Sequence, residues 1–210
     1  MKKTALVSLT VLAIIFYGCS SSSIKSQTIG TQIWTTKNLN IDHFRNGDKI
    51  LEAKTDEQWK AAGKNRQPVW CYYNNDSANG KIYGKLYNWY AVNDPRGLAP
   101  EGWHVPSDDE WTQLIDYAGG EDIAGKKLKS KSIRLWSDND NGTDDYDFAG
   151  FPSGNRDLNG TFSIGNCGIW WSSSEYTIES AWLRYLNFNV KVFRNYDYKR
   201  FGSSVRCVKD

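Results

Sequence analysis

The chain has 210 residues, and its 26 Lys and Arg nearly balance its 24 Asp and Glu. This length predicts one domain with a sizeable core, and the ten tryptophans, single methionine and 18 glycines indicate a rigid, turn-rich extracellular domain rather than a helical bundle. The sequence has no block of Lys and Arg and no nucleic-acid-binding motif, so nucleic acid is excluded as a partner.

The N-terminus predicts export. Lys2 and Lys3 precede an apolar run from Ala5 to Tyr17, which is shorter than the about 20 residues that a membrane span needs. Removing residues 1–18 takes away these two lysines and no acid, so the formal charge of +2 falls to zero. The chain that remains is not a basic protein.

The segment that follows the apolar run indicates a lipid anchor. Phe16-Tyr17-Gly18-Cys19 resembles a bacterial lipobox, which implies cleavage before Cys19 and acylation of that cysteine. The serines that follow suit a flexible tether. We expect residues 1–18 to be a lipoprotein signal peptide, residues 19–28 a tether and residues 29–210 one domain, held in the bacterial envelope at the outer membrane or cell surface. The alternative is an ordinary signal peptide with an incidental cysteine.

Three further cysteines, Cys71, Cys167 and Cys207, are an odd number, so at most one intramolecular disulfide forms among them. Spacing leaves all three pairings open. Cys71–Cys207 is preferred because both cysteines lie in predicted strands and would tie the early chain to the last strand. Such a bridge would stabilise the fold by about 2–4 kcal/mol. No C-x-x-C motif is present, so a zinc or thioredoxin-like site lacks its spacing.

The first half of the chain carries helix signals. Thr55 and Gln58 form a capping box that opens a short helix with Trp59, ending at Gly63. Between Tyr83 and Val92, the spacing of apolar residues predicts one or two turns of buried helix. Short strands are expected at 29–40 and 68–73.

The clearest helix start is Ser107, which has Glu110 at the third helical position. Apolar residues then recur at helical spacing through Ala118, and a second short helix is expected from Glu121 to Leu128. We expect three tryptophans around this region to be core residues and His104 to be a buried imidazole with satisfied hydrogen bonds. These tryptophans are Trp89, Trp103 and Trp111.

Residues 136–168 are rich in Asp, Asn and Gly and predict a long polar loop, a feature that is often functional. Four carboxylates in it could bind calcium, which takes about six to eight oxygen ligands. The alternative, which we favour, is a solvated loop whose side chains bond their own backbone. No cofactor is required in that case. The candidate ligands are Asp138, Asp140, Asp144 and Asp145.

Residues 169–208 predict a run of antiparallel strands joined by polar turns. Two short-to-medium helices in the first half, followed by strands and a long polar loop in the second, predict an α+β fold.

Five segments carry a family resemblance: YGKLYNWYAV, LAPEGWHVPSDDEW, GKKLKS, IWWSSSEY and SVRCV. In this order they resemble the Fibrobacter succinogenes major paralogous domain family over roughly residues 29–209. The resemblance implies secreted or lipid-anchored proteins with a C-type-lectin-like fold, related to the formylglycine-generating enzymes. The close cysteine pair of those enzymes and the calcium motifs of sugar-binding lectins are absent from the sequence.

Aromatic residues that lie among polar neighbours are the candidate ligand contacts, with two arginines as polar anchors. We expect a non-catalytic binding module for a polysaccharide or a surface protein. The alternatives are an enzyme related to the formylglycine-generating group and a purely structural envelope protein. The candidate contacts are Trp136, Tyr146, Arg156, Tyr176 and Arg194, with Tyr196 and Tyr198 nearby.

Overall fold

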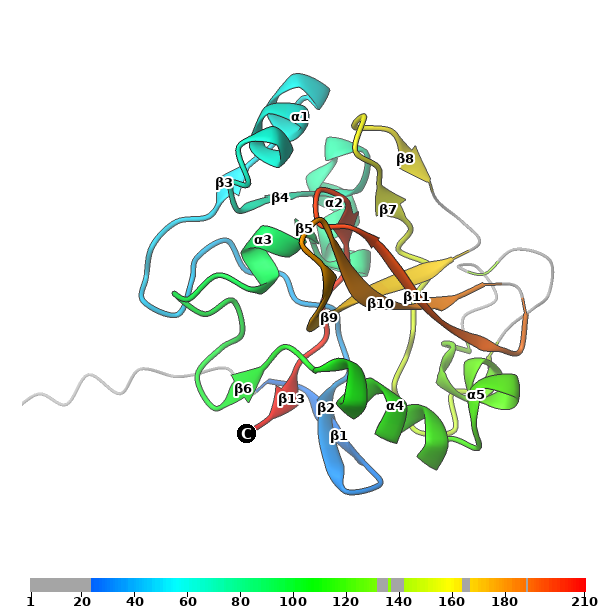
Figure 1. Ribbon diagram of the computed structural model, residues 1–210. Helices are drawn as coiled ribbons and strands as arrows, with labels where there is room; N and C mark the ends of the chain where they lie inside the picture. Colours follow the sequence, from blue (N-terminus) through cyan, green and yellow to red (C-terminus); the bar gives the residue numbers. More distant parts are fainter. Residues whose placement is uncertain (1–23, 132–135, 137–141, 164–166, 188) are drawn as a thin grey trace, which may run out of the picture.

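The computed structural model describes residues 24–131, 136, 142–163, 167–187 and 189–210, and every structural statement below concerns these residues. Three β-sheets form the centre of the molecule, and helices pack around them (Figure 1). This arrangement confirms the α+β prediction. None of the helices in the described ranges is long and apolar enough to cross a membrane.

A four-stranded antiparallel sheet brings the two ends of the described chain together, as Figure 1 shows near the C-terminus. The predicted strand at 29–40 is instead part of a hairpin, because the chain turns at Gly30, whose φ of +62° suits glycine. In spatial order the strands are β1 (Ser26–Ile29), β2 (Gln32–Thr35), β13 (Val208–Lys209) and β6 (Trp103–His104).

A six-stranded sheet is built from very short strands that come from both halves of the chain. β3 and β4 pair in parallel, and the other pairs are antiparallel. Two of the strands fall inside the polar segment 136–168, so part of the expected loop is sheet. In spatial order they are β3 (Leu51–Glu52), β4 (Val69–Cys71), β5 (Leu86–Asn88), β12 (Gly202–Ser203), β7 (Asn155–Arg156) and β8 (Phe162–Ser163).

The longest strands form a three-stranded antiparallel sheet, which confirms the predicted run of strands after residue 168. β10 lies in the middle, between β9 and β11. The register of β9 against β10 shifts near Ala181, so the outer half of β9 bends relative to its inner half. The bounds are β9 (Gly168–Thr177), β10 (Ser180–Leu186) and β11 (Val192–Tyr198).

The capped helices form where the sequence predicts them. The Thr55 side chain accepts a hydrogen bond from the N–H of Gln58, and Ser107 with Glu110 forms a complete capping box. The helix expected within 83–92 begins only at Trp89, because β5 precedes it and the Asn88 side chain caps it. The bounds are α1 (Asp56–Lys64), η1 (Tyr73–Asn75, a 3-10 turn), α2 (Ser77–Tyr83), α3 (Trp89–Val92), α4 (Asp108–Tyr117) and α5 (Glu121–Leu128).

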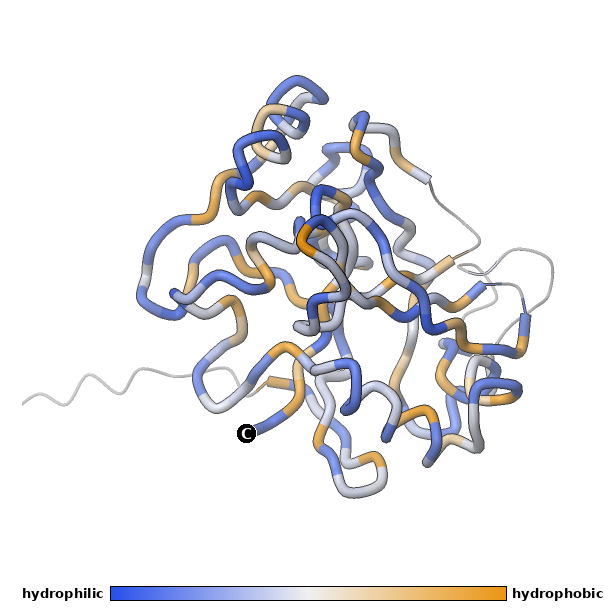
Figure 2. Tube along the Cα trace, in the orientation of Figure 1, coloured by the Kyte–Doolittle hydropathy of each residue, from blue (hydrophilic) through white to orange (hydrophobic). Residues whose placement is uncertain are grey.

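The core is rich in tryptophan and also contains buried arginines. Trp89, Trp103 and Trp111 are buried, as the sequence predicts. Helix α1 is mostly hydrophilic in Figure 2, in keeping with a helix that buries only the side carrying Trp59 and Ala62. Three arginines are fully buried and bond backbone and side-chain oxygens inside the protein; these are Arg156, Arg184 and Arg206.

Candidate functional site

One face of the three-stranded sheet carries a group of aromatic side chains. Trp182 on β10 stands directly opposite Tyr196 on β11, and such cross-strand partners share a face of the sheet. Tyr176, at the outer end of β9, joins them. The rings of Tyr176 and Tyr196 are stacked with centroids 4.1 Å apart, and Tyr176 lies 4.6 Å from Trp182. We call Tyr176, Trp182 and Tyr196 the aromatic cluster.

The aromatic cluster is accessible to solvent. Tyr176 is 44% exposed and Tyr196 is 48% exposed, whereas Trp182 beneath them is half-buried. Ile178 and Tyr198 extend the exposed apolar surface toward the β9–β10 turn and along β11. A contiguous group of exposed large apolar side chains is unusual on a soluble domain and marks an interaction surface.

An arginine lies flat on the cluster. The guanidinium carbon of Arg194 is 3.5 Å from the centroid of the Trp182 ring. Its Nε and Nη2 donate to the carboxylate of Asp108, the first residue of α4, at 2.8–3.2 Å. The stacking and the ion pair together fix the plane of the guanidinium.

Asp108 also accepts from a second, buried arginine. Arg184 donates from Nη1 to Asp108 Oδ1 at 2.6 Å, and only 1% of its side chain is exposed. Burial raises the pKa of Asp108, but the hydrogen bonds and charges of the two arginines outweigh it, so the net pKa is lowered and the carboxylate is ionised. The pKa of Arg194 is raised by the same carboxylate.

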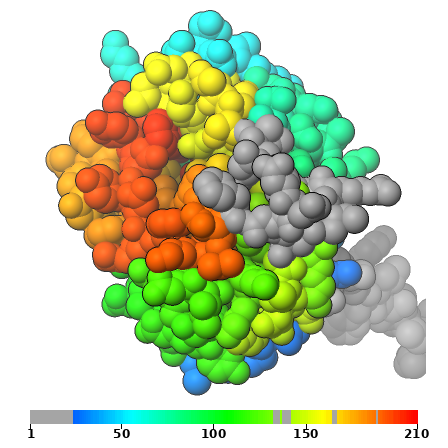
Figure 3. All heavy atoms as spheres, turned by 90° about the vertical axis from the view of Figure 1, so that its right-hand side faces the viewer, coloured from blue at the N-terminus to red at the C-terminus, as the bar shows by residue number. Residues whose placement is uncertain are grey.

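Ion pairs border the cluster at the outer end of the sheet. Lys199 is buried, and its Nζ lies 2.6 Å from the carboxylate of Glu175 and 4.6 Å from the Trp89 ring. Arg66 and Glu179 form an exposed pair at 2.6 Å. In the space-filling view of Figure 3, the orange atoms of β11 lie at the surface beside the green atoms of α4 and α5. The arrangement can therefore offer a ligand ring faces, tyrosine hydroxyls and a guanidinium.

Two predicted ligand contacts are wrong because their side chains are interior. Trp136 is buried in the core, and its Nε1 donates to the carbonyl of Gly150 at 3.2 Å. Arg156 is fully buried; its Nη2 donates to Asp56 at 2.8 Å and its Nη1 to the carbonyl of Ala53. Each polar group is satisfied inside the protein, so neither side chain is presented to a ligand.

The remaining candidates divide between the cluster and other parts of the surface. Tyr176 and Arg194 meet in the aromatic cluster. Tyr146 is half-buried instead, and its ring packs 5.6 Å from that of Tyr117 on α4. The sequence reasoning missed Trp182, although the alternation of β10 and β11, once paired, places it opposite Tyr196.

The carboxylates proposed for calcium are only partly described by the structure. Asp138 and Asp140 lie outside the described residues. The Asp144 carboxylate accepts a hydrogen bond from the N–H of Ala149 at 2.8 Å, and burial raises its pKa. Asp145 is exposed. Across the described part of the chain, no three His, Cys, Asp or Glu side chains are grouped to hold a metal ion. Calcium binding stays a prediction.

The predicted disulfide is absent, since Cys71, Cys167 and Cys207 are all free thiols. Cys71 packs in the cluster of core residues around Trp59, whereas Cys207 packs in a different one, with Tyr87 and Val205. Cys71 ends β4, whereas Cys207 precedes β13 in a different sheet and is not itself in a strand as expected; sequence alone could not reveal this separation.

His104 differs from its prediction in burial but not in bonding. Its side chain is 39% exposed, so it is not a core residue. Both ring nitrogens are satisfied: Nδ1 lies 2.8 Å from Asp210 Oδ1, and Nε2 lies 2.7 Å from Glu110 Oε1.

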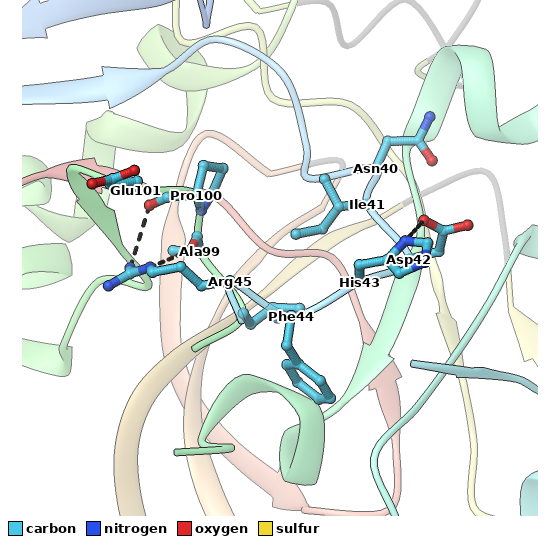
Figure 4. Close-up of a pocket in the computed structure, with 10 residues that line it drawn as sticks. Asn40, Ile41, Asp42, His43, Phe44, Arg45, Ala99, Pro100 and Glu101 are labelled. Atoms are coloured by element: carbon cyan, nitrogen blue, oxygen red, sulfur yellow. Dashed lines mark hydrogen bonds and ion pairs between the residues drawn. The ribbon is translucent and has the colours of Figure 1, made fainter. Parts of the chain in front are cut away.

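An open pocket of about 450 Å³ lies elsewhere, lined by residues 40–45 and 98–101 (Figure 4). His43 Nδ1 and Asp42 Oδ1 are 2.6 Å apart in it. Arg45 is engaged by the carbonyls of Ala99, Pro100 and Trp103. Because its main cation already bonds backbone oxygens, this pocket offers a ligand less than the aromatic cluster does.

The fold and the site together define an α+β domain with an exposed aromatic cluster on its three-stranded sheet, which has the longest strands. The family model of the Fibrobacter succinogenes major domain matches residues 28–209, and the chain belongs to this family. Comparisons with curated proteins and with solved structures found no match. The family resemblance in the sequence is thereby confirmed, whereas the lectin-like fold and the relation to the formylglycine-generating enzymes stay predictions.

Proposed function

We propose that the protein is a non-catalytic binding module of the cell envelope and that the aromatic cluster binds polysaccharide. One observation carries the proposal: two half-exposed tyrosines are stacked on each other and contact Trp182 edge-on, on a rigid sheet. Aromatic rings with a polar edge can pack against the apolar face of a sugar while their hydroxyls bond its polar groups. Because the rings are already ordered by their mutual contacts, binding costs little further conformational entropy.

A surface protein is the second candidate ligand, because Tyr, Trp and Arg are enriched at the energetic centres of protein interfaces. The size of the cluster favours the glycan. A stable protein interface buries about 800 Å² on each partner and involves about 20–30 residues a side. Three rings and an arginine are instead suited to a few sugar units.

The N-terminal segment supports a location for this module. We propose that Cys19 is acylated and that residues 19–28 tether the domain to the bacterial envelope, at the outer membrane or cell surface. The support is the lipobox-like Phe16 to Cys19 and the serines after it. Fractionation of cells that express the full chain tests this: the wild type is expected with the membranes, and the Cys19→Ser variant is expected to lose the lipid mass and the membrane association.

A glycan array with the chain from Ser20 onward tests the binding proposal. Tyr176→Ala and Tyr196→Ala are expected to weaken binding of any glycan that the wild type retains by about tenfold, which corresponds to about 1.4 kcal/mol. Tyr117→Ala is the matched control, because Tyr117 is also exposed but lies on α4, packed against Tyr146. Absence of any glycan signal, or equal losses in all three variants, would remove the proposal.

A further inference from the structure

Two arginines share the single carboxylate of Asp108. Arg184 is buried, with 1% of its side chain exposed, whereas 40% of the Arg194 side chain is exposed. Arg184 donates to Oδ1 of this carboxylate, and Arg194 donates to both Oδ1 and Oδ2. The group of three therefore keeps one formal positive charge.

Burial decides which arginine carries that surplus charge. A charge taken out of water must be compensated inside the protein, so Arg184 depends on Asp108 for its neutralisation. Its Nη2 is also held by the carbonyl of Asp108 and the hydroxyl of Thr112. The surplus charge consequently resides on Arg194, at the surface and on the aromatic cluster.

Two other carboxylates influence Arg194 from a greater distance. Asp109 and Glu121 raise its pKa through their charge, after the larger effect of Asp108. Neither forms an ion pair with Arg194. Exposed charges that do not touch are screened by solvent and salt, so these two do not occupy the guanidinium.

The geometry of Arg194 leaves one part of its guanidinium available. Nε and Nη2 are directed at Asp108, and the ring of Trp182 lies against the guanidinium plane. Within the described residues, Nη1 has no hydrogen-bond partner, and it belongs to a side chain that solvent reaches. A planar guanidinium fixed in this way presents its remaining donors at a defined angle to a ligand above the tyrosines.

We propose that the aromatic cluster selects acidic polysaccharides, with Arg194 binding the carboxylate of a uronic acid unit while the tyrosines pack against the sugar ring. This inference rests on the proposed polysaccharide binding and adds the substrate class. A carboxylate suits the site because guanidinium donors match its planar oxygens in geometry as well as charge. Arg194 is thus assigned as the specificity-determining residue.

The test compares pairs of ligands that differ only in their carboxylates. Polygalacturonate, alginate and hyaluronan are each titrated calorimetrically against their carboxyl-reduced forms, beside neutral glucans and galactans and a sulfated galactan. At least one uronate polymer is expected to bind about tenfold more tightly than its reduced form, since charge-assisted hydrogen bonds exceed neutral ones by about this factor. The preference is expected to shrink as salt is raised.

Variants assign the preference to Arg194. Arg194→Gln is expected to abolish it, so that a uronate polymer and its reduced form bind this variant equally, and Arg194→Lys is expected to restore part of the preference. Arg96→Gln is the matched control, because Arg96 also stacks on an aromatic ring, that of Phe44 at 4.1 Å, and pairs with Asp94. Thermal melts check that each variant is folded.

The outcomes separate the two proposals. Binding of neutral glycans with no uronate preference, or a preference that survives Arg194→Gln, overturns the inference and leaves the polysaccharide proposal intact. Binding of sulfated polymers in place of uronates overturns the carboxylate assignment. If no polymer of either kind binds, the proposed function fails, and the inference fails with it.

Discussion

The imidazole of His104 and the carboxylate of Glu110 join β6 to the start of α4, with Nε2 and Oε1 2.7 Å apart. Glu110 also accepts from the backbone N–H and hydroxyl of Ser107. Burial lowers the pKa of His104, but its hydrogen bonds to Asp210 and Glu110 outweigh that effect, so the pKa is raised. Burial raises the pKa of Glu110, yet its bonds to Ser107 and His104 leave it lowered.

These opposite shifts predict a pH window for the stability that the contact contributes. A raised histidine pKa stabilises the folded state fully below the unfolded value of about 6.5, and this is lost as pH rises through the folded pKa. A lowered glutamate pKa stabilises above its unfolded value of about 4.3, and this is lost as pH falls. Both contributions act together between these values.

His104→Gln is therefore expected to lower the free energy of unfolding at about pH 6 and to have much less effect at about pH 9. Urea denaturation at the two pH values measures this difference. His43→Gln is the control, since His43 is the only other histidine in the chain and lies in an exposed pair with Asp42. A His104→Gln effect that is constant across this range would show that imidazole charge contributes nothing.

Arg206 is expected to be among the least replaceable residues. It is fully buried, and it donates to the carbonyls of Thr35, Phe148 and Ala149 and to the side chain of Asn38. Burial lowers its pKa to about 9, so it is still charged at neutral pH. Replacement leaves several buried acceptors without donors.

Arg206→Met should cost more than about 3 kcal/mol of stability. Arg206→Lys should cost nearly as much, because one ammonium group cannot reach all the acceptors that the planar guanidinium reaches. Urea denaturation at neutral pH measures both. The control, Arg96→Met at a partly exposed arginine, should change stability much less. An Arg206→Lys protein as stable as the wild type would mean that charge alone suffices at this position.

The free thiols give a direct chemical prediction. Burial raises the pKa of Cys71 to about 12 and that of Cys207 to about 12. Almost no reactive thiolate is present at either residue near neutral pH. A thiol reagent should consequently label the folded protein slowly and preferentially at Cys167, which is less buried, and should label all three after denaturation.

Peptide mapping under non-reducing conditions supplies the second measurement on the same residues. The structure predicts that Cys71, Cys167 and Cys207 all appear in unlinked peptides. Recovery of a Cys71–Cys207 linked peptide would instead restore the pairing that the sequence favoured.

Local signals account for what the sequence predicted well. The cap at Ser107 and the helix at Glu121–Leu128 depend on neighbouring residues, and both form as expected. The family could also be recognised from short motifs. What failed depends on distant packing: Arg156 is buried because Asp56 and Ala53, about 100 residues earlier, supply its acceptors.

The candidate site shows the same division. A polar neighbourhood suggested correctly that Tyr176 is exposed, but it suggested the same of Trp136, which the fold buries next to Gly150 and Lys129. Trp182 lies in a largely apolar run and was not among the candidate contacts. Its position in the cluster follows only from the register of β10 with β11, which no short segment encodes.

The close packing of α5 against the chain that leads into β11 predicts an unusual response at Gly125. Alanine in a helix is normally better than glycine by up to about 1 kcal/mol. Here an added Cβ would lie 2.4 Å from the carbonyl oxygen of Lys191 and 2.7 Å from that of Val190. Because both are backbone atoms, the segment entering β11 would have to move.

Gly125→Ala is therefore expected to destabilise the fold by about 1–3 kcal/mol, the usual cost of overpacking, and to weaken ligand binding by shifting the strand that carries Arg194 and Tyr196. Gly63→Ala in α1 is the matched control: its Cβ would meet only the Arg200 side chain at 3.2 Å, which can yield, so stability should change by less than about 1 kcal/mol. Urea denaturation and glycan titration of both variants give the answer. A Gly125→Ala protein that is as stable as the Gly63→Ala protein would show that α5 and β11 are not packed this closely.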